Sequence, residues 1–437
     1  MKSSHCFDVV IVGAGASGLS CAAHLLKQNV DLMVLEARPR IGGRVFTQGS
    51  PHPSIPIELG AEFIHAASPL VLDLLKKTGH DFYDAQFEQL FLKNGKLIEQ
   101  KDFWDRFEKV LALPDSERKT DRSMADFLKA HKAIPKDMRD LLIGYIEGFQ
   151  AADINLIGEK AFAESEKDKR DLNGNNDFRI VGGYCDVLQG LMQNSLKKKI
   201  ALEHPVTQIN WNKKQIEIIC TLPSGRRRHI HAKQVVLAVP LAVLQGQHKK
   251  SQIEFKPEIP ELLPALSHLH VGHVQRLVFI FKTRFWENLS EKNPVCFLRA
   301  PHNMYFSTWW TLSPLRAPYL IAWQGGPMAQ ELSNMSDNAR IEKALQTLSK
   351  ITNRSLAFLK KEVSSVHQHN WSKDPYAMGA YTYTGIENQD YKPKTYPHFH
   401  GFLWLTGEAF AKADGQGTVH GALEHGFEIA QKILQAL

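Results

Sequence analysis

Three glycines at positions 13, 15 and 18 have the spacing that could hold a phosphate-bearing ligand against the backbone. Gly13 permits a tight turn, Gly15 lets backbone N–H groups approach a pyrophosphate, and Gly18 lets a helix pack closely on a strand. A helix that begins near Ala16 and Ser17 would direct its N-terminal N–H groups and its partial positive charge at the phosphates. The chemistry that these residues favour is dinucleotide binding.

The elements around the glycines are those that such a site needs. The apolar run 9–12 precedes them, a helical stretch follows, and a second apolar run, 32–35, ends on Glu36. This acid, eighteen residues after the third glycine, is placed to accept ribose hydroxyls and disfavours a 2′-phosphate. An ordinary strand–turn–helix without a ligand is the alternative, and the glycines alone do not separate FAD from NAD.

A second glycine pair follows Glu36 directly. Gly42 and Gly43 permit another close backbone approach, and Arg44 offers a cation that can pair with a phosphate. With these segments the chain resembles the flavin-dependent amine oxidases, the family of monoamine, polyamine and L-amino acid oxidases. The matching segments are E-A-R-x-R-x-G-G-R at 36–44, E-x-G-A at 58–61, W-x-x-D-P-x-x-x-G-x-Y at 371–381, and the C-terminal stretches 403–408 and 415–422.

The resemblance spans nearly all 437 residues and implies an α/β fold. We expect a Rossmann-like, glutathione-reductase-like FAD-binding domain and a discontinuous α+β substrate-binding domain. The FAD-binding domain would comprise 1–67, 176–240 and 371–437, and the substrate-binding domain 68–175 and 241–370. Apolar residues three and four apart predict helices from 70 through 142. Apolar runs at 274–281 and 319–324 predict an antiparallel sheet that forms the floor of the substrate pocket.

The resemblance also implies the cofactor and its contacts. FAD would be bound non-covalently, because Ala380 stands where monoamine oxidases carry the flavin-linking cysteine. Val206 would touch the adenine end, Trp371 would flank the flavin ring, and Glu408 would contact the ribityl or pyrophosphate part. Residues 417–419 would open a helix that stabilises negative charge at flavin N1 and O2. The full set of expected FAD contacts is Gly13, Gly15, Ala16, Ser17, Gly18, Glu36, Ala37, Arg38, Gly42, Gly43, Arg44, Gly60, Ala61, Glu62, Phe63, Val206, Trp371, Gly407, Glu408, Gly417, Thr418 and Val419.

The implied reaction is hydride transfer from the carbon beside an amine nitrogen to flavin N5. The imine product would be hydrolysed, and O2, reduced to H2O2, is the expected electron acceptor. Tyr381 matches the first of two aromatic rings that the family often places before the flavin, whereas Thr418 occupies the position of the second. The family's lysine near N5 corresponds to Arg276, which stays protonated and could hold a water, bind a substrate carboxylate or pair with an acid.

Glu62 completes the candidate catalytic set of Arg276, Tyr381, Glu62, Trp371 and Thr418. Its carboxylate could hold a distal ammonium, which favours a di- or polyamine substrate, or it could pair with a basic residue such as Arg44. Three other functions stay open. They are an L-amino acid oxidase, a flavoenzyme like the desaturases and protoporphyrinogen oxidases, and a flavin-binding scaffold with little turnover.

The composition argues against a membrane protein, a nucleic-acid-binding protein and a metalloprotein. A hydrophobic content of 43% and a charged content of 23% are ordinary for a soluble globular protein. Five scattered cysteines indicate reduced thiols and a cytoplasmic location. The net charge of +7 comes with clusters such as 197–199 and 226–228, which we interpret as solvated surface rather than a nucleic-acid site. No apolar run is long enough to predict a membrane span, and histidine pairs such as 229/231 lack further ligands, so no metal is expected. The oligomeric state is left open.

Overall fold

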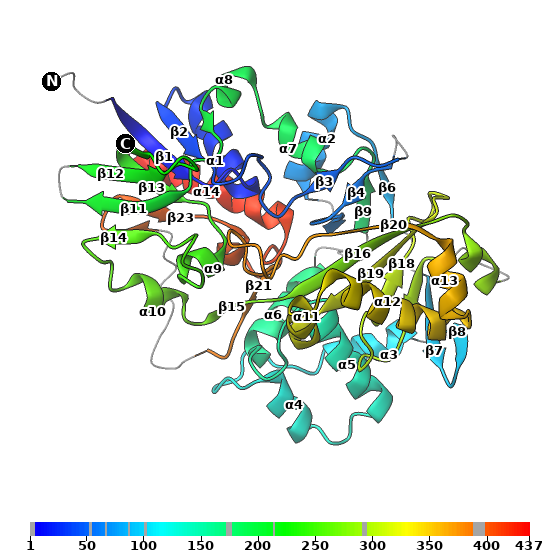
Figure 1. Ribbon diagram of the computed structural model, residues 1–437. Coiled ribbons are helices and arrows are strands. Elements are labelled where there is room, and N and C mark those ends of the chain that lie inside the picture. Colours follow the sequence, from blue (N-terminus) through cyan, green and yellow to red (C-terminus); the bar gives the residue numbers. More distant parts are fainter. Residues whose placement is uncertain are drawn as a thin grey trace.

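The computed structural model describes residues 5–51, 55–65, 68–85, 88–99, 103–171, 177–212, 215–290, 295–387 and 398–437. Two unlike parts lie side by side (Figure 1). One is built on a sheet with parallel strands and the other on a mainly antiparallel sheet flanked by helices.

The first part is a nine-stranded sheet assembled from distant segments. Its path β10-β2-β1-β13-β12-β11-β14 is parallel from β10 to β13, and β23 adds to β13, also in parallel. The strands are β1 (Cys6–Val12), β2 (Leu32–Leu35), β10 (Ile200–Ala201), β11 (Val206–Trp211), β12 (Ile216–Thr221), β13 (Arg227–Leu237), β14 (Glu254–Lys256), β22 (His398–Phe399) and β23 (Leu403–Leu405).

Both faces of this sheet are buried. Val9 and Ile11 of β1 belong to the core under helices α1 (Ala16–Lys27) and α14 (Val419–Ala436). Val10 belongs to a second core on the other face. The near-continuous apolar run of β1 is therefore the pattern of a central parallel strand.

The second part is a seven-stranded sheet in the order β20-β16-β19-β18-β17-β7-β8. The predicted antiparallel pairing of 274–281 with 319–324 is confirmed by β16 and β19. Its strands are β7 (Gln89–Lys93), β8 (Lys96–Glu99), β16 (Val274–Phe281), β17 (Phe297–Arg299), β18 (Thr308–Trp310), β19 (Tyr319–Gly325) and β20 (Val363–Gln368). One face packs on helices α11 (Gly326–Ser333), α12 (Asp337–Thr352) and α13 (Leu356–Glu362).

Helices occur in the segment where the spacing from 70 to 142 predicts them, but the prediction is wrong for three stretches of it. β6 (Phe82–Asp84), β7 and β8 are strands, because distant partners, β9 (Asp177–Ile180) and β17, pair with β6 and β7. The helices are α2 (Pro69–Thr78), α3 (Phe103–Leu111), α4 (Met124–Ala130), α5 (Lys136–Gly148) and α6 (Glu159–Asp171).

The other described elements lie outside these two sheets. They are β3 (Thr47–Gln48), β4 (Ile57–Glu58), β5 (Phe63–His65), β15 (Leu269–Val271), β21 (Thr382–Thr384), α7 (Tyr184–Gly190), α8 (Asn194–Lys197), α9 (Leu241–Leu244), α10 (Leu262–Leu266) and short 3-10 turns at Phe285–Leu289 and Glu408–Phe410. The predicted division of the chain at 240 assigns β14 to the substrate-binding part, whereas β14 pairs with β11 of the first sheet. The predicted boundaries at 67 and at 175/176 lie outside the described residues.

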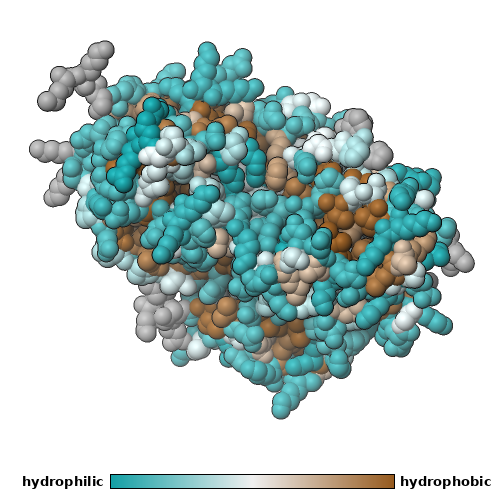
Figure 2. All heavy atoms as spheres, viewed as in Figure 1, coloured by the Kyte–Doolittle hydropathy of each residue, from teal (hydrophilic) through white to brown (hydrophobic). Residues whose placement is uncertain are grey.

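The surface agrees with an ordinary globular chain. The face in Figure 2 is mainly hydrophilic, with apolar patches scattered over it. All five cysteines are free thiols. Within the described ranges, no helix combines the length and the apolar character that crossing a membrane requires, and no group of three or more histidine, cysteine or acidic side chains could hold a metal ion.

Candidate active site

A cavity of about 1260 Å³ lies between the two parts and is lined by residues of both. Of the expected FAD contacts, the following line it: Gly13, Gly15, Ala16, Ser17, Glu36, Ala37, Arg38, Gly42, Gly43, Arg44, Gly60, Ala61, Glu62, Phe63, Val206, Trp371, Gly407, Glu408, Gly417, Thr418 and Val419. Gly18 alone among the expected contacts lies outside this lining. It acts through packing, because a Cβ there would stand 2.0 Å from the Gly13 carbonyl oxygen.

The glycine turn has the geometry of a phosphate cradle. Gly13 has a φ of +108°, and a Cβ there would meet the Ala238 carbonyl oxygen at 2.6 Å. Gly15, by contrast, has ordinary extended backbone, and a Cβ added to it would have no neighbour within 4 Å. Within the part of the chain that the structure describes, no contact crowds a side chain at position 15, so the open space before Gly15 fits a bound group that approaches the backbone.

Glu36 stands at the end of β2, as a ribose-binding acid should. It is buried and accepts hydrogen bonds from the backbone N–H groups of Ala14 at 2.8 Å and Arg38 at 2.9 Å. These two bonds fix the carboxylate at the cavity wall. Arg38 itself is held by Asp374 at 2.8 Å.

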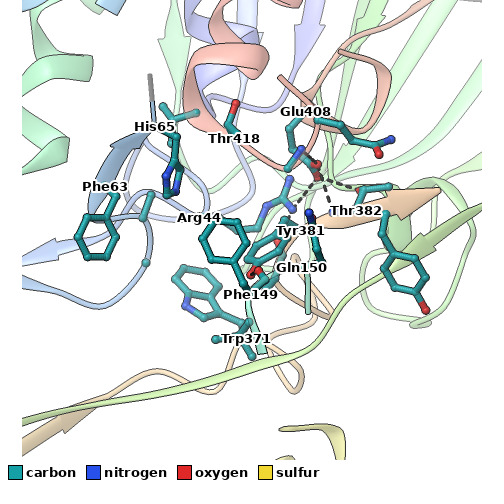
Figure 3. Close-up of a pocket in the computed structure, with 18 of the residues that line it drawn as sticks. Arg44, Phe63, His65, Phe149, Gln150, Trp371, Tyr381, Thr382, Glu408 and Thr418 are labelled. Carbon is teal, nitrogen blue, oxygen red and sulfur yellow. Dashed lines mark hydrogen bonds and ion pairs between the residues drawn. The ribbon is translucent and has the colours of Figure 1, made fainter. Parts of the chain in front are cut away.

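Arg44 and Glu408 line the cavity and form an ion pair, which we call the clamp (Figure 3). Arg44 Nη1 donates to Glu408 Oε1 at 2.9 Å and also to the Ala380 carbonyl oxygen. Glu408 further accepts bonds from the Thr382 hydroxyl at 3.0 Å and from the Gly417 N–H at 3.1 Å. Glu408 therefore joins three segments that would surround the cofactor.

The walls nearest this clamp are aromatic. Trp371 is buried and donates Nε1–H to the Leu59 carbonyl oxygen at 2.8 Å. Tyr381 points toward Phe149 (Figure 3), and its hydroxyl donates to the Phe149 carbonyl oxygen at 2.5 Å. Thr418 caps α14, because its hydroxyl accepts the N–H of Gly421 at 3.0 Å. Thr418 thus stands at the start of the expected helix, and Phe149 adds a second aromatic side chain to the lining beside the Tyr381 hydroxyl.

Glu62 has two arginine partners, neither of them Arg44. Arg179 Nε donates to its Oε1 at 2.6 Å and Arg276 Nη2 to its Oε2 at 2.5 Å, while the Trp310 indole N–H contacts both oxygens. Burial alone would raise the pKa of Glu62, but the charges of Arg276 and Arg179 outweigh it and hold the pKa below its ordinary value. These contacts favour the alternative in which Glu62 pairs with a basic residue. The partners are Arg179 and Arg276 instead of Arg44.

Arg276 retains one unused donor. Its Nε–H is buried and has no hydrogen-bond partner among the described residues, although Nη2 meets Glu62 and Nη1 approaches the Gly60 carbonyl oxygen at 3.4 Å. A buried donor at a cavity wall costs free energy unless something accepts from it. A bound flavin, or a water beside it, could accept a hydrogen bond from Arg276 Nε. The residues of this cavity wall therefore fit a bound flavin.

The contacts also identify residues that the motifs do not contain. Glu166 on α6 is buried at the cavity wall and accepts hydrogen bonds from the Tyr145 hydroxyl at 3.0 Å and from Gln150 Nε2 at 3.1 Å. The Tyr145 ring stacks on Phe149 at 5.2 Å. We call Tyr145, Gln150 and Glu166 the Glu166 cluster. A buried acid within a helix carries no sequence signal of its own, because most helical glutamates are on the surface.

A buried acid behind the site gives a pH prediction. Burial raises the pKa of Glu58 to about 7, although the Tyr184 N–H and the Thr47 hydroxyl donate to it. The unfolded-state pKa of a glutamate is about 4.3, so the folded protein favours the protonated form of Glu58. The stabilisation from this preference is complete below about pH 4.3 and is lost as the pH rises through about 7. The unfolding free energy of the unaltered protein should therefore decrease between about pH 5 and pH 8. In the Glu58→Gln variant we expect this decrease to be smaller, by up to about 3 kcal/mol. Chemical denaturation at both pH values measures this, and an unchanged slope would contradict it.

Comparison with known proteins agrees with the cavity. The sequence matches the family described as flavin-containing amine oxidoreductase over residues 16–434. It is 27% identical to polyamine oxidase 3 of Oryza sativa subsp. japonica, over 99% of this chain and 90% of that protein. It is 25% identical to the flavin-containing amine oxidase A of Equus caballus, over 100% of this chain and 86% of that protein.

Solved structures share the fold. Putrescine oxidase bound to putrescine superimposes with a TM-score of 0.81 at 18% identity, over 99% of this chain and 100% of that one. Cyclohexylamine oxidase from Brevibacterium oxydans gives 0.79 at 19% identity, over 99% of both chains. The predicted α/β fold class is confirmed. Because the family match covers nearly the whole sequence, the protein belongs to the flavin-containing amine oxidoreductases.

Proposed function

We propose that this amine oxidoreductase acts on a di- or polyamine, and that the Glu166 cluster binds the ammonium at the far end of the substrate. The observation that carries the proposal is a buried carboxylate in the cavity wall, oriented by Tyr145 and Gln150. Gln150 follows Phe149, whose carbonyl oxygen accepts from Tyr381. The two oxygens of Glu62, the other acid considered for this role, bind Arg179 and Arg276.

Bound FAD supplies the hydride acceptor, N5 of its flavin ring. The glycine turn and Glu36 would hold the nucleotide end of the cofactor, and the clamp of Arg44 and Glu408 would lie beside the cofactor in the cavity wall. The faces of Tyr381, Phe149 and Trp371 enclose the reacting end and exclude water. Aromatic faces attract an ammonium moderately and tolerate the neutral amine, the form from which hydride can leave. The imine product would be hydrolysed, and O2 would reoxidise the reduced flavin. We also propose a cytoplasmic location, which the five free thiols support.

The reaction is tested by anaerobic bleaching of the visible flavin absorbance. The panel holds putrescine, spermidine, spermine, N-acetylated polyamines, an aromatic monoamine and several L-amino acids. We expect diamines or polyamines to bleach the flavin, and rapid recovery in air to identify O2 as an acceptor. Bleaching by L-amino acids alone would favour the amino acid oxidase. No bleaching at all would favour a scaffold or an enzyme for large apolar substrates.

Glu166→Gln tests the distal subsite. A hydrogen bond to a charged group contributes about 1.5–3 kcal/mol, so we expect kcat/KM for putrescine to fall about 10- to 100-fold. The effect on an aromatic monoamine should be much smaller. Glu164→Gln, an exposed acid on the same helix, is the matched control. Equal losses for diamine and monoamine would remove the ammonium-binding role from Glu166.

A further inference from the structure

One row of residues crosses the floor of the cavity from strand to strand. Arg276 of β16 pairs with Trp323 of β19, Trp323 with Thr308 of β18, and Thr308 with Arg299 of β17. Directly paired residues of a sheet project to the same face, and all four line the cavity. The row thus runs from an arginine beside Glu62 to a second arginine three strand spacings away, about 14 Å at the Cα positions.

The two arginines differ in their partners. Arg276 meets the Glu62 carboxylate, whereas Arg299 forms no ion pair within the described ranges. Arg299 Nε donates to Gln89 Oε1 at 3.1 Å, and its Nη1 donates to the Thr308 hydroxyl at 2.7 Å. These two bonds fix the plane of the guanidinium. They also leave Nη2, and the second N–H of Nη1, without a hydrogen-bond partner among the described residues, while the guanidinium lies 5.5 Å from the centre of the Phe297 ring.

The charges around this end of the floor do not neutralise Arg299. Asp137 and Asp140 line the same cavity, but Arg106 binds the first at 2.6 Å and Lys136 the second at 2.7 Å. Burial lowers the pKa of Arg299 to about 10, so it is still protonated at neutral pH. The other titratable groups of the lining on α3, β7 and the loop after β17 are Glu108, Lys93 and His302.

We propose that Arg299 is a subsite for a carboxylate carried on the tail of the amine substrate. The planar guanidinium, held at Nε and Nη1, presents its other N–H groups to a carboxylate as a fork. The row places this fork far from Arg276, so it selects a carboxylate at the end of a chain rather than the α-carboxylate of an amino acid. Resting on the proposed amine oxidation, this inference adds carboxylate-bearing amines to the substrate class.

Binding without turnover is the first test. The FAD-loaded protein is titrated with heptanoate and with the neutral, equally long heptanamide, and binding is followed by calorimetry and by the flavin spectrum. We expect heptanoate to bind at least about 10-fold more tightly than heptanamide, and Arg299→Met to remove the difference. Equal affinity of the two probes for the unaltered protein would overturn the proposal without any variant.

Turnover is the second test. Amines of one chain length that end in a carboxylate, an amide or an ammonium are compared. Arg299→Met should lower kcat/KM about 10- to 100-fold for the carboxylate only, and Arg299→Lys, which keeps the charge but not the fork, should lose less. Arg316→Met, at an exposed pair with Glu287, is the matched control. A uniform loss for all three tails would contradict the subsite. If no amine is oxidised, the proposed function fails, while the heptanoate titration still tests Arg299.

Discussion

Replacing Gly15 with valine is expected to give a folded protein that does not retain FAD. The backbone at Gly15 has φ −77° and ψ −177°, which valine adopts freely, and a Cβ there meets no atom within 4 Å. The side chain would instead fill the space through which a pyrophosphate approaches the N-terminus of α1. Two lost hydrogen bonds to a charged group correspond to about 3–6 kcal/mol, so FAD affinity should fall at least about 100-fold.

The measurement combines the FAD content of the purified protein, a titration of the apoprotein with FAD, and thermal unfolding of the apoprotein. Gly49→Val is the control, because a Cβ at Gly49 is equally unobstructed and Gly49 lies outside the cavity lining. Gly18→Val gives the contrasting outcome. Its Cβ would stand 2.0 Å from the Gly13 carbonyl oxygen, so folding itself should suffer. Normal FAD binding by Gly15→Val would show that the cofactor does not lie on this turn.

Replacing Glu62 with glutamine is expected to destabilise the fold by about 3–5 kcal/mol, because it leaves two buried arginines without their shared carboxylate. The side chains of Glu62 and Arg179 are each 4% exposed, and that of Arg276 is 5% exposed, so water cannot replace the lost partner. Urea denaturation of the apoprotein measures the change. Glu342→Gln, which breaks the exposed pair with Lys360, should cost less than about 1 kcal/mol.

The pH dependence checks the same charge network. The pKa of Glu62 is held below its ordinary value, so its stabilisation is present above the unfolded-state pKa of about 4.3 and is lost as the pH falls through the folded-state value. The Glu62→Gln variant should lack this component of the acid-induced loss. A cost under about 1 kcal/mol at neutral pH would mean that Glu62 does not hold the arginines together, and its role in binding a distal ammonium would regain support.

The expectations drawn from the family motifs agree with the cavity wherever each motif is local. The strand, glycine turn, helix and acid from 9 to 36 fold together, because their contacts join residues close in sequence, such as Ala14 with Glu36. Tyr381, Trp371 and Thr418 likewise lie in the cavity lining. The roles of these residues stay predictions until the experiments above are done.

Other features depended on packing between distant segments. The strands β6 and β7 were hidden in a region whose spacing predicts helices, since their partners lie in β9 and β17. Phe149, Glu166 and Arg299 belong to no motif. They line the cavity only because α5, α6 and β17 pack around it.

The sequence by itself determined the family, the cofactor and the class of reaction. These rest on short motifs whose glycines and acids contact backbone groups close to them in the sequence, as Glu36 contacts Ala14. Only the tertiary structure decided which charges meet. Glu62 binds Arg179 and Arg276, 117 and 214 residues away along the chain. Whether a buried carboxylate or guanidinium is neutralised depends on which distant strand lies opposite it, and that is fixed by the packing of the two parts. The same packing places the Glu166 cluster and Arg299 in the cavity lining, where we propose that they select the amine.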